Sequence, residues 1–191
     1  MIFTKMDKIK VLGISGSLRA DSYNTALLKS SVELSKEYMD IEIYDISRIP
    51  LYNHDHEKIK IPESVIEFKS AIESCDSLLF ALPEYNSSVT GVLKNAIDWA
   101  SRAESPLNGK PCAIMGASGG LSGTAGAQLH FRNIASSVNL ICMNAPKLQL
   151  RRSKSLFNEN NVLTDQSTVE HLIKFLKAFE EWTLKFMNKK K

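Results

Sequence analysis

Short apolar runs alternate with amphipathic segments along this chain, and the alternation predicts its fold. Five apolar runs have the length of β-strands, and we expect strands at residues 8–15, 41–46, 77–82, 110–116 and 139–145. Between and after these runs, apolar side chains recur every three to four positions, which predicts helices beginning near residues 24, 62, 92, 124 and 167. Pro62 suits a first helical position, and Ser167 with Glu170 forms a capping box at the start of the last helix.

Strands that alternate with helices in this way predict an α/β fold, an open parallel sheet with helices on both faces. We expect a five-stranded sheet with strand order 2-1-3-4-5. No repeat, linker or low-complexity block divides the chain, so the prediction is one domain over residues 1–191. In such sheets the ligand lies beyond the carboxyl ends of the strands, where the strand order reverses. With this order, the first and third strands flank that point.

The loop after the first predicted strand, residues 13–24, has the composition of a phosphate pocket. Free backbone N–H groups at the start of the following helix point at an anion, and the helix dipole favours negative charge there. Ser17, Ser22 and Asn24 can donate further hydrogen bonds, and Arg19 supplies a fixed positive fork. The same residue types also cap helices, so this loop alone leaves both interpretations open.

Two more loops rich in Gly, Ser and Asn follow the third and fourth predicted strands, at residues 83–91 and 117–123. With strand order 2-1-3-4-5, all three loops meet at one crevice. Helix capping explains any one of them, but three convergent loops indicate a ligand with a phosphate end and a flat polar head.

Composition and charge exclude several other classes of protein. The 191 residues are 43% hydrophobic and 24% charged, which is ordinary for a globular domain. The net charge is +3, and the last three residues, 189–191, are all lysine. Basic residues do not form a stripe interleaved with aromatics, so we expect no nucleic-acid partner. No apolar run approaches the length of a membrane span, so we expect no membrane insertion.

Cys75, Cys112 and Cys142 are odd in number, far apart in the sequence, and each in or beside an apolar run. This pattern favours buried, reduced thiols over disulfides or metal ligands, and it predicts a cytoplasmic protein.

The polar run at residues 54–57, His-Asp-His-Glu, is a weak metal candidate, because adjacent residues rarely face one ion. We expect a solvated loop there and no metal site.

The predicted helix from Val92 to about Arg102 is apolar nearly all round. One side can pack on the sheet, and the other is available to a second subunit, which leads to the hypothesis of a homodimer. The two apolar stripes consist of Val92, Ala96 and Trp99, and of Leu93, Ile97 and Ala100.

With the first two loops in view, the chain resembles the NADPH-dependent FMN reductase family. This is a flavodoxin-like group that includes bacterial chromate and quinone reductases and related azoreductases. The resemblance spans most of the chain. It is carried by residues 16–19 with Ser22 and Asn24, by residues 83–86 and by residues 91–99, and it is supported by residues 49–52 and 118–120.

The resemblance implies a three-layer flavodoxin-like sandwich that binds FMN without a covalent bond. It implies that the FMN phosphate is held by Ser17, Arg19, Ser22 and Asn24. It further implies that the isoalloxazine edge is lined by Pro83, Glu84, Tyr85 and Asn86, and that the far side of the ring is closed by Ser118 and Gly120.

The resemblance also implies an enzyme that takes electrons from NADPH or NADH. Flavin carries out the redox chemistry, so the protein binds, orients and tunes it. The nicotinamide would deliver hydride to the flavin, leave, and be replaced by a small-molecule acceptor, a ping-pong cycle that needs no catalytic side chain. The acceptor stays open among quinones, chromate, azo compounds and free flavin.

The family resemblance implies a dimer or a tetramer with sites near the subunit interface. Some relatives carry an Arg and an aromatic residue that help to join dimers into tetramers. This chain has Gly126 and Leu129 at those places, which argues against the tetramer and leaves FMN binding untouched.

Two alternative functions use the same loops differently. Residues 116–120 fit the pattern of a nucleophile elbow, in which a serine hydrolase would use Ser118 with Asp165 and His171. The other alternative is a flavin electron carrier or a redox-regulated binding protein. Carriers of this fold are usually strongly acidic, so the net charge of +3 argues against it.

Overall fold

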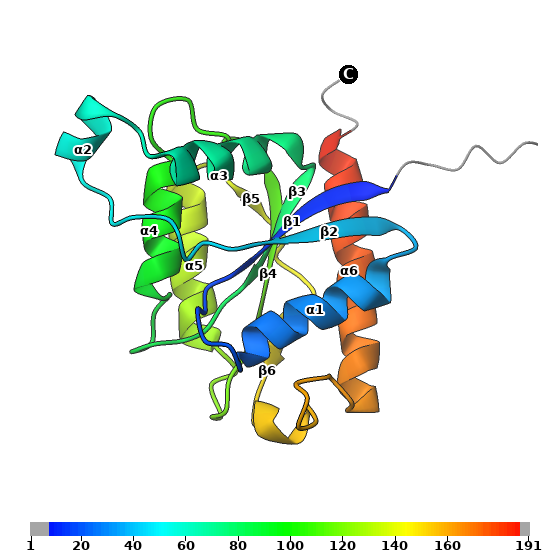
Figure 1. The fold of residues 1–191 in the computed structure, drawn as a ribbon. Helices are drawn as coiled ribbons and strands as arrows, with labels where there is room; N and C mark the ends of the chain where they lie inside the picture. Colours follow the sequence, from blue (N-terminus) through cyan, green and yellow to red (C-terminus); the bar gives the residue numbers. More distant parts are fainter. Residues whose placement is uncertain (1–7, 188–191) are drawn as a thin grey trace, which may run out of the picture.

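The predicted apolar runs form one parallel sheet in the computed structural model, which describes residues 8–187 (Figure 1). Residues 1–7 and 188–191, with the lysines at 189–191, lie outside the described residues. The sheet has the expected order β2-β1-β3-β4-β5, and every strand pair is parallel. These strands are β1 (Ile9–Ser15), β2 (Met39–Tyr44), β3 (Ser77–Ala81), β4 (Pro111–Ala117) and β5 (Ile141–Cys142).

The prediction of one fifth strand over residues 139–145 was wrong. Only Ile141–Cys142 forms β5, and a sixth strand, β6 (Leu148–Leu150), follows it. β5 pairs with the start of β4 and β6 pairs with its end, so two short strands share one edge. Pro146 lies between the two short strands and has no N–H to offer to a ladder, so one strand does not run through both.

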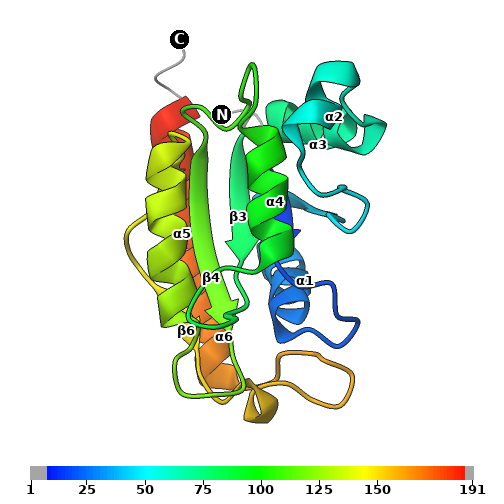
Figure 2. The same ribbon diagram turned by 90° about the vertical axis from the view of Figure 1, so that its left-hand side faces the viewer.

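Helices cover both faces of the sheet, as the alternation of elements predicted (Figures 1 and 2). On one face, α1 (Tyr23–Ser35) and α6 (Gln166–Met187) bury leucine and phenylalanine side chains against β3 and β4. On the other face lie α3 (Glu63–Ser74), α4 (Gly91–Ala100) and α5 (Ala125–Ser137). All residues of β3 and β4 are buried, as expected for central parallel strands. Figure 2 shows α4 and α5 side by side in the second layer.

Three details at helix starts differ from the prediction. The polar run at 54–57 is not a loop but part of a short helix, α2 (His54–Ile59), because the Asn53 side chain accepts the Asp55 N–H and caps it. The cap of α6 is Asp165 rather than Ser167, since Asp165 Oδ1 accepts the Thr168 N–H at 2.8 Å. Pro62 stands at the N-cap of α3, one residue before the expected position.

The apolar stripe of α4 that contains Val92, Ala96 and Trp99 is covered by the chain itself. Trp99 is only 1% exposed, and its indole N–H donates to the Pro50 carbonyl at 2.8 Å. The Tyr52 ring packs edge-on against the indole, and Asn95 bonds both the Pro50 carbonyl and the Tyr52 N–H. This stripe is therefore buried within the chain and is not available to a second subunit, so it does not support the homodimer hypothesis.

Candidate functional site

The loops after β1, β3 and β4 meet at the carboxyl end of the sheet, as expected from the strand order. The arrowheads of β3 and β4 in Figure 2 point to this end. The loops enclose a cavity of about 340 Å³. Its lining consists of Ser17, Arg19, Ser22, Tyr23, Asn24, Pro83, Glu84, Tyr85, Ala117, Ser118, Gly119 and Gly120.

The first loop is held by contacts to its neighbours across the sheet. The Gly16 N–H donates to the Ala81 carbonyl at 2.9 Å, and the Thr90 hydroxyl donates to the Gly16 carbonyl at 2.7 Å. A Cβ on Gly16 would stand 2.9 Å from Pro83 Cδ, closer than real Cβ atoms come. Glycine is therefore required where the first and second loops touch.

The start of α1 presents unpaired donors to the cavity. Ser22 is the N-cap: its side chain accepts the Thr25 N–H and its carbonyl accepts the Ala26 N–H. Within residues 8–187, the N–H groups of Tyr23 and Asn24 have no acceptor, as is usual for a first helical turn. These N–H groups, with the hydroxyls and the guanidinium of the same loop, make a donor set suited to an anion.

Asn24 has a further role that the sequence did not predict. Its side chain is 5% exposed, and its amide makes two bonds of 2.9 Å to Ala117, donating to the carbonyl and accepting the N–H. The side chain therefore ties the start of α1 to the end of β4, where the third loop begins. One amide hydrogen remains for a ligand.

The second loop contributes Pro83, Glu84 and Tyr85 to the lining. Glu84 Oε2 accepts the Ala127 N–H at 3.0 Å, so this carboxylate caps α5 in place of Thr124, which makes no side-chain cap bond. Asn86 was grouped with these residues, but it is not part of the cavity lining. It has a φ of 52° and lies in a tight turn in which Tyr85 and Ser88 exchange two backbone hydrogen bonds.

The third loop is supported by residues 150–153, which lie between the last predicted strand and the last predicted helix. The Ser118 N–H donates to the Leu150 carbonyl of β6, and the Arg152 N–H donates to the Gly120 carbonyl, both at 2.9 Å. The Ser153 hydroxyl, in a 3₁₀ turn (Ser153–Ser155), donates to the Ser118 carbonyl. The segment after Pro146 therefore positions the far wall of the cavity.

Sequence reasoning missed three lining residues, Tyr23, Ala117 and Gly119. Tyr23 stands between two predicted site residues, which was a usable signal, and its ring packs 5.3 Å from that of Phe157. Ala117 and Gly119 flank the predicted Ser118, whereas the pairing of Ala117 with Asn24 has no local sign in the sequence.

The charge distribution of the cavity fits a phosphate-bearing ligand. Among the described residues, Arg19 is the only cationic side chain in the lining and Glu84 is the only carboxylate. The Glu84 oxygen is engaged at the start of α5, where the helix dipole favours negative charge. The phosphate end can therefore lie against Arg19, the serines and the N–H groups of α1, which together form the donor end of the cavity.

A catalytic triad for the hydrolase alternative is not assembled. The Ser118 hydroxyl oxygen accepts the Gly120 N–H, and Asp165 is engaged in capping α6. In the part of the chain that the structure describes, no hydrogen bond joins Ser118 to His171 or Asp165.

The polar run of α2 is engaged in its own contacts. The Tyr52 hydroxyl donates to Glu57 Oε2 at 2.8 Å, and His54 Nδ1 lies 3.2 Å from the same oxygen. These two hydrogen bonds, that of Tyr52 first, lower the pKa of Glu57. Among residues 8–187, no group of three His, Cys, Asp or Glu side chains is placed to hold a metal ion. None of the helices in that range has the length and apolar character needed to cross a bilayer.

Comparisons with known proteins agree with this geometry. The family model for NADPH-dependent FMN reductase matches residues 9–154. An NAD(P)H-dependent FMN reductase of Pseudomonas aeruginosa is 47% identical over 177 residues, which cover 92% of this chain and 96% of the relative. An NAD(P)H:quinone oxidoreductase of Solanum tuberosum is 41% identical over 187 residues, covering 95% and 96%. The solved structure of FerB, a flavoenzyme NAD(P)H:(acceptor) oxidoreductase of Paracoccus denitrificans, has a TM-score of 0.87 at 35% identity and covers 93% of this chain and 98% of its own.

Proposed function

The chain belongs to the NADPH-dependent FMN reductase family, and we propose that the cavity beyond β1, β3 and β4 is its FMN site. The protein is an NAD(P)H-dependent flavin oxidoreductase of the quinone reductase type. One observation carries the assignment of the site: three loops that are far apart in the sequence line one cavity, with donors at one end.

The phosphate end of the cofactor is assigned to the β1–α1 loop. Ser17 and Ser22 would donate hydroxyl hydrogen bonds, Arg19 would supply the opposite charge, and the first N–H groups of α1 would point at the phosphate. Asn24 would act mainly as a positioning residue, because both ends of its amide already bond Ala117.

The ring end is assigned to the second and third loops. Pro83, Glu84 and Tyr85 would line one edge of the isoalloxazine, and Ser118 and Gly120 would close the opposite side. Asn86 would shape the turn beside Tyr85 rather than touch the ring, since it lies outside the lining.

Bound FMN would supply the redox chemistry, accepting a hydride from NAD(P)H and passing the electrons to a quinone in a ping-pong sequence. The chain's own part is to bind and orient. Tyr85 is 53% exposed at the rim, so it can form a wall of the slot in which nicotinamide and acceptor alternate. No side chain of the lining is paired with a base as a nucleophile would be, so none is assigned a covalent role.

A visible absorbance spectrum of the purified protein under nitrogen tests the proposal. The expected protein is yellow, bleaches when NADPH is added, and recovers its colour when a quinone follows. Steady NAD(P)H oxidation with a quinone and no partner protein would separate the enzyme from an electron carrier. A colourless protein that takes up no added FMN would overturn the site assignment.

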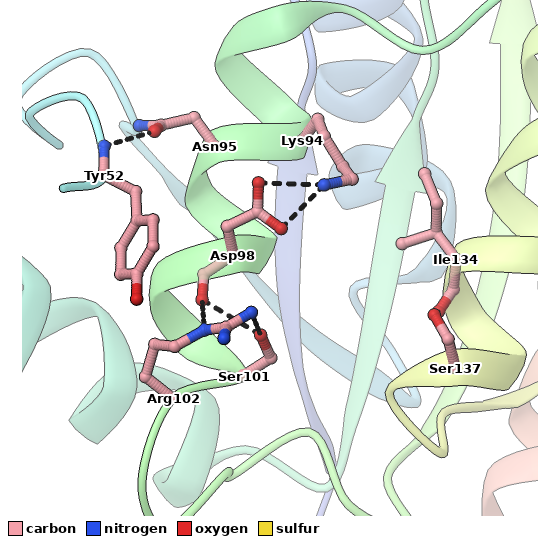
Figure 3. Close-up of polar contacts among 8 residues, drawn as sticks. All are labelled: Tyr52, Lys94, Asn95, Asp98, Ser101, Arg102, Ile134 and Ser137. Carbon is pink, nitrogen blue, oxygen red and sulfur yellow. Dashed lines mark hydrogen bonds and ion pairs between the residues drawn. The ribbon is translucent and has the colours of Figure 1, made fainter. Parts of the chain in front are cut away.

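We further propose that the protein is a homodimer, as the resemblance to the FMN reductase family implies, and that the groove between α4 and α5 is the contact surface. The groove has a volume of about 710 Å³. Its α4 side is polar, with Lys94 paired to Asp98 at 2.7 Å and the Arg102 guanidinium bonded to the Asp98 carbonyl, while Ile134 and Ser137 of α5 face it (Figure 3). Gly126 and Leu129 lack the side chains that join dimers of some relatives, so assembly would stop at two.

We also propose a cytoplasmic location. It is supported by the three cysteines, which are all free thiols in the structure, as expected for a reducing compartment.

A further inference from the structure

Two of the three cysteines, which are distant in the sequence, lie opposite each other on neighbouring strands. Cys112 of β4 and Cys142 of β5 are direct partners in a parallel pair, and the Met143 N–H fixes the register by donating to the Cys112 carbonyl at 2.8 Å. Both side chains pack in the core between the sheet and α5. Neighbouring strands lie about 4.8 Å apart, which is inside the range of about 4.4–6.8 Å between the Cα atoms of disulfides.

The two thiols have different surroundings. Cys112 is fully buried, whereas Cys142 is partly exposed at the edge of the sheet. The Arg132 guanidinium of α5 donates to Cys142 Sγ at 3.5 Å and is held there by Asn144 Oδ1 and the Met143 carbonyl. A positive group is therefore fixed in direct contact with the more accessible sulfur.

This difference sets the protonation of the pair. The hydrogen bond from the Cys112 thiol, followed by the charge of Arg132, lowers the pKa of Cys142. Burial, followed by the same hydrogen bond, raises the pKa of Cys112. The accessible thiol is thus the better nucleophile, and the buried thiol retains its proton.

We propose that Cys112 and Cys142 are a peroxide-sensitive dithiol, in which Cys142 is oxidised first and Cys112 then closes a disulfide. The Cys142 thiolate attacks hydrogen peroxide, the O–O bond breaks, and a sulfenic acid forms while hydroxide leaves. The Cys112 sulfur then attacks the Cys142 sulfur, the S–O bond breaks, and the oxygen leaves as water with the Cys112 proton. The two sulfurs together give up two electrons, and the peroxide becomes two waters.

The fold allows this closure without disturbing the central strands. β5 has only two residues and lies at the end of the strand order, so it can shift toward β4. Cys75 provides an internal comparison, because its thiol donates to the Ile72 carbonyl and burial raises its pKa. Neither thiol lines the proposed FMN site.

The test is peptide mapping of the full-length, FMN-loaded protein after treatment with hydrogen peroxide. Tryptic cleavage after lysine and arginine places Cys75, Cys112 and Cys142 in three different peptides. The expected result is a cross-linked pair of the Cys112 and Cys142 peptides, with two of the three thiols lost to alkylation and recovered by dithiothreitol.

Variants identify the order of the steps. Cys75→Ser should form the cross-link at the rate of the parent, and Cys112→Ser should leave a sulfenic acid on Cys142 that dimedone traps. Arg132→Gln should slow the loss of the Cys142 thiol several-fold, since the thiolate is less favoured. Oxidation of Cys75 as fast as Cys142, or passage of Cys142 to sulfinic acid without any cross-link, would overturn the proposal. The mapping of the parent protein decides this even if a variant fails to fold.

Discussion

At the scale of single residues, the cavity separates side chains that face the ligand space from those that hold its walls. Ser17 and Arg19 contact little of the chain beyond their own loop. The side chains of Asn24 and Glu84, in contrast, form hydrogen bonds with the backbone of Ala117 and of Ala127. Substitutions in the two groups should therefore differ in whether they change the stability of the protein without cofactor.

Arg19→Ala should weaken FMN retention more than it slows turnover at saturating FMN. A hydrogen bond to a charged group contributes about 1.5–3 kcal/mol, which is about ten- to a hundredfold in Kd. Titration of the apoprotein with FMN, followed by flavin fluorescence, measures the change. Arg48→Ala is the matched control, because Arg48 pairs with Glu67 away from the cavity. Equal FMN affinity in Arg19→Ala and the parent would contradict the phosphate assignment.

Asn24→Asp should destabilise the apoprotein as well as weaken FMN binding. A carboxylate cannot donate to the Ala117 carbonyl, so a buried hydrogen bond is replaced by repulsion. The expected loss is about 1–3 kcal/mol, or several degrees in Tm by thermal denaturation of the apoprotein. If the apoprotein melts like the parent and only FMN binding falls, Asn24 serves the ligand alone.

At the scale of elements, two helices are capped by side chains that the sequence did not single out as caps. Glu84 caps α5 from another loop, and Asp165 caps α6 two residues before the expected serine. The two Thr168 hydrogen bonds, from its side chain first, lower the pKa of Asp165. The stability of α6 is therefore coupled to pH.

Asp165→Asn should change how stability depends on acid pH. Because the folded-state pKa of Asp165 is lowered, its stabilisation is present above the usual Asp pKa of about 3.9 and is lost as pH falls through the folded-state value. Asparagine still caps the helix but does not titrate there. The Tm of the parent should exceed that of the variant at neutral pH, and the difference should shrink on acidification. A difference that stays constant with pH would show that ionisation of Asp165 does not matter.

At the scale of the whole molecule, the cavity and the α4–α5 groove involve different loops and helices. The cavity is lined by the three loops at the carboxyl end of the sheet, whereas the groove is lined by α4, α5 and the loop after α4 (Figures 2 and 3). A partner bound in the groove would therefore leave the cavity lining unchanged.

Ser137→Trp should convert the proposed dimer to a monomer. Ser137 is exposed on α5 and lines the groove, so an indole there would fill the space that a second chain needs. Ser136→Trp is the control, since Ser136 is exposed on the same helix but does not line the groove. Light scattering at micromolar concentration should give twice the chain mass for the parent and control. A monomeric parent would contradict the dimer, and a dimeric Ser137→Trp would place the interface elsewhere.

The sequence by itself determined the α/β class, the strand order, the three loops, and all but three of the residues that line the cavity. It could do so because strands and helices follow local periodicity, and because parallel topology brings loops after neighbouring strands to one edge. The tertiary structure alone decided the split of the last strand, the cover over Trp99, and the pairing of Asn24 with Ala117. It also decided that Asn86 lies outside the lining and that Cys112 meets Cys142. The contact between Asn24 and Ala117 joins residues 93 positions apart. A local sequence pattern cannot specify which distant residue such a side chain will contact.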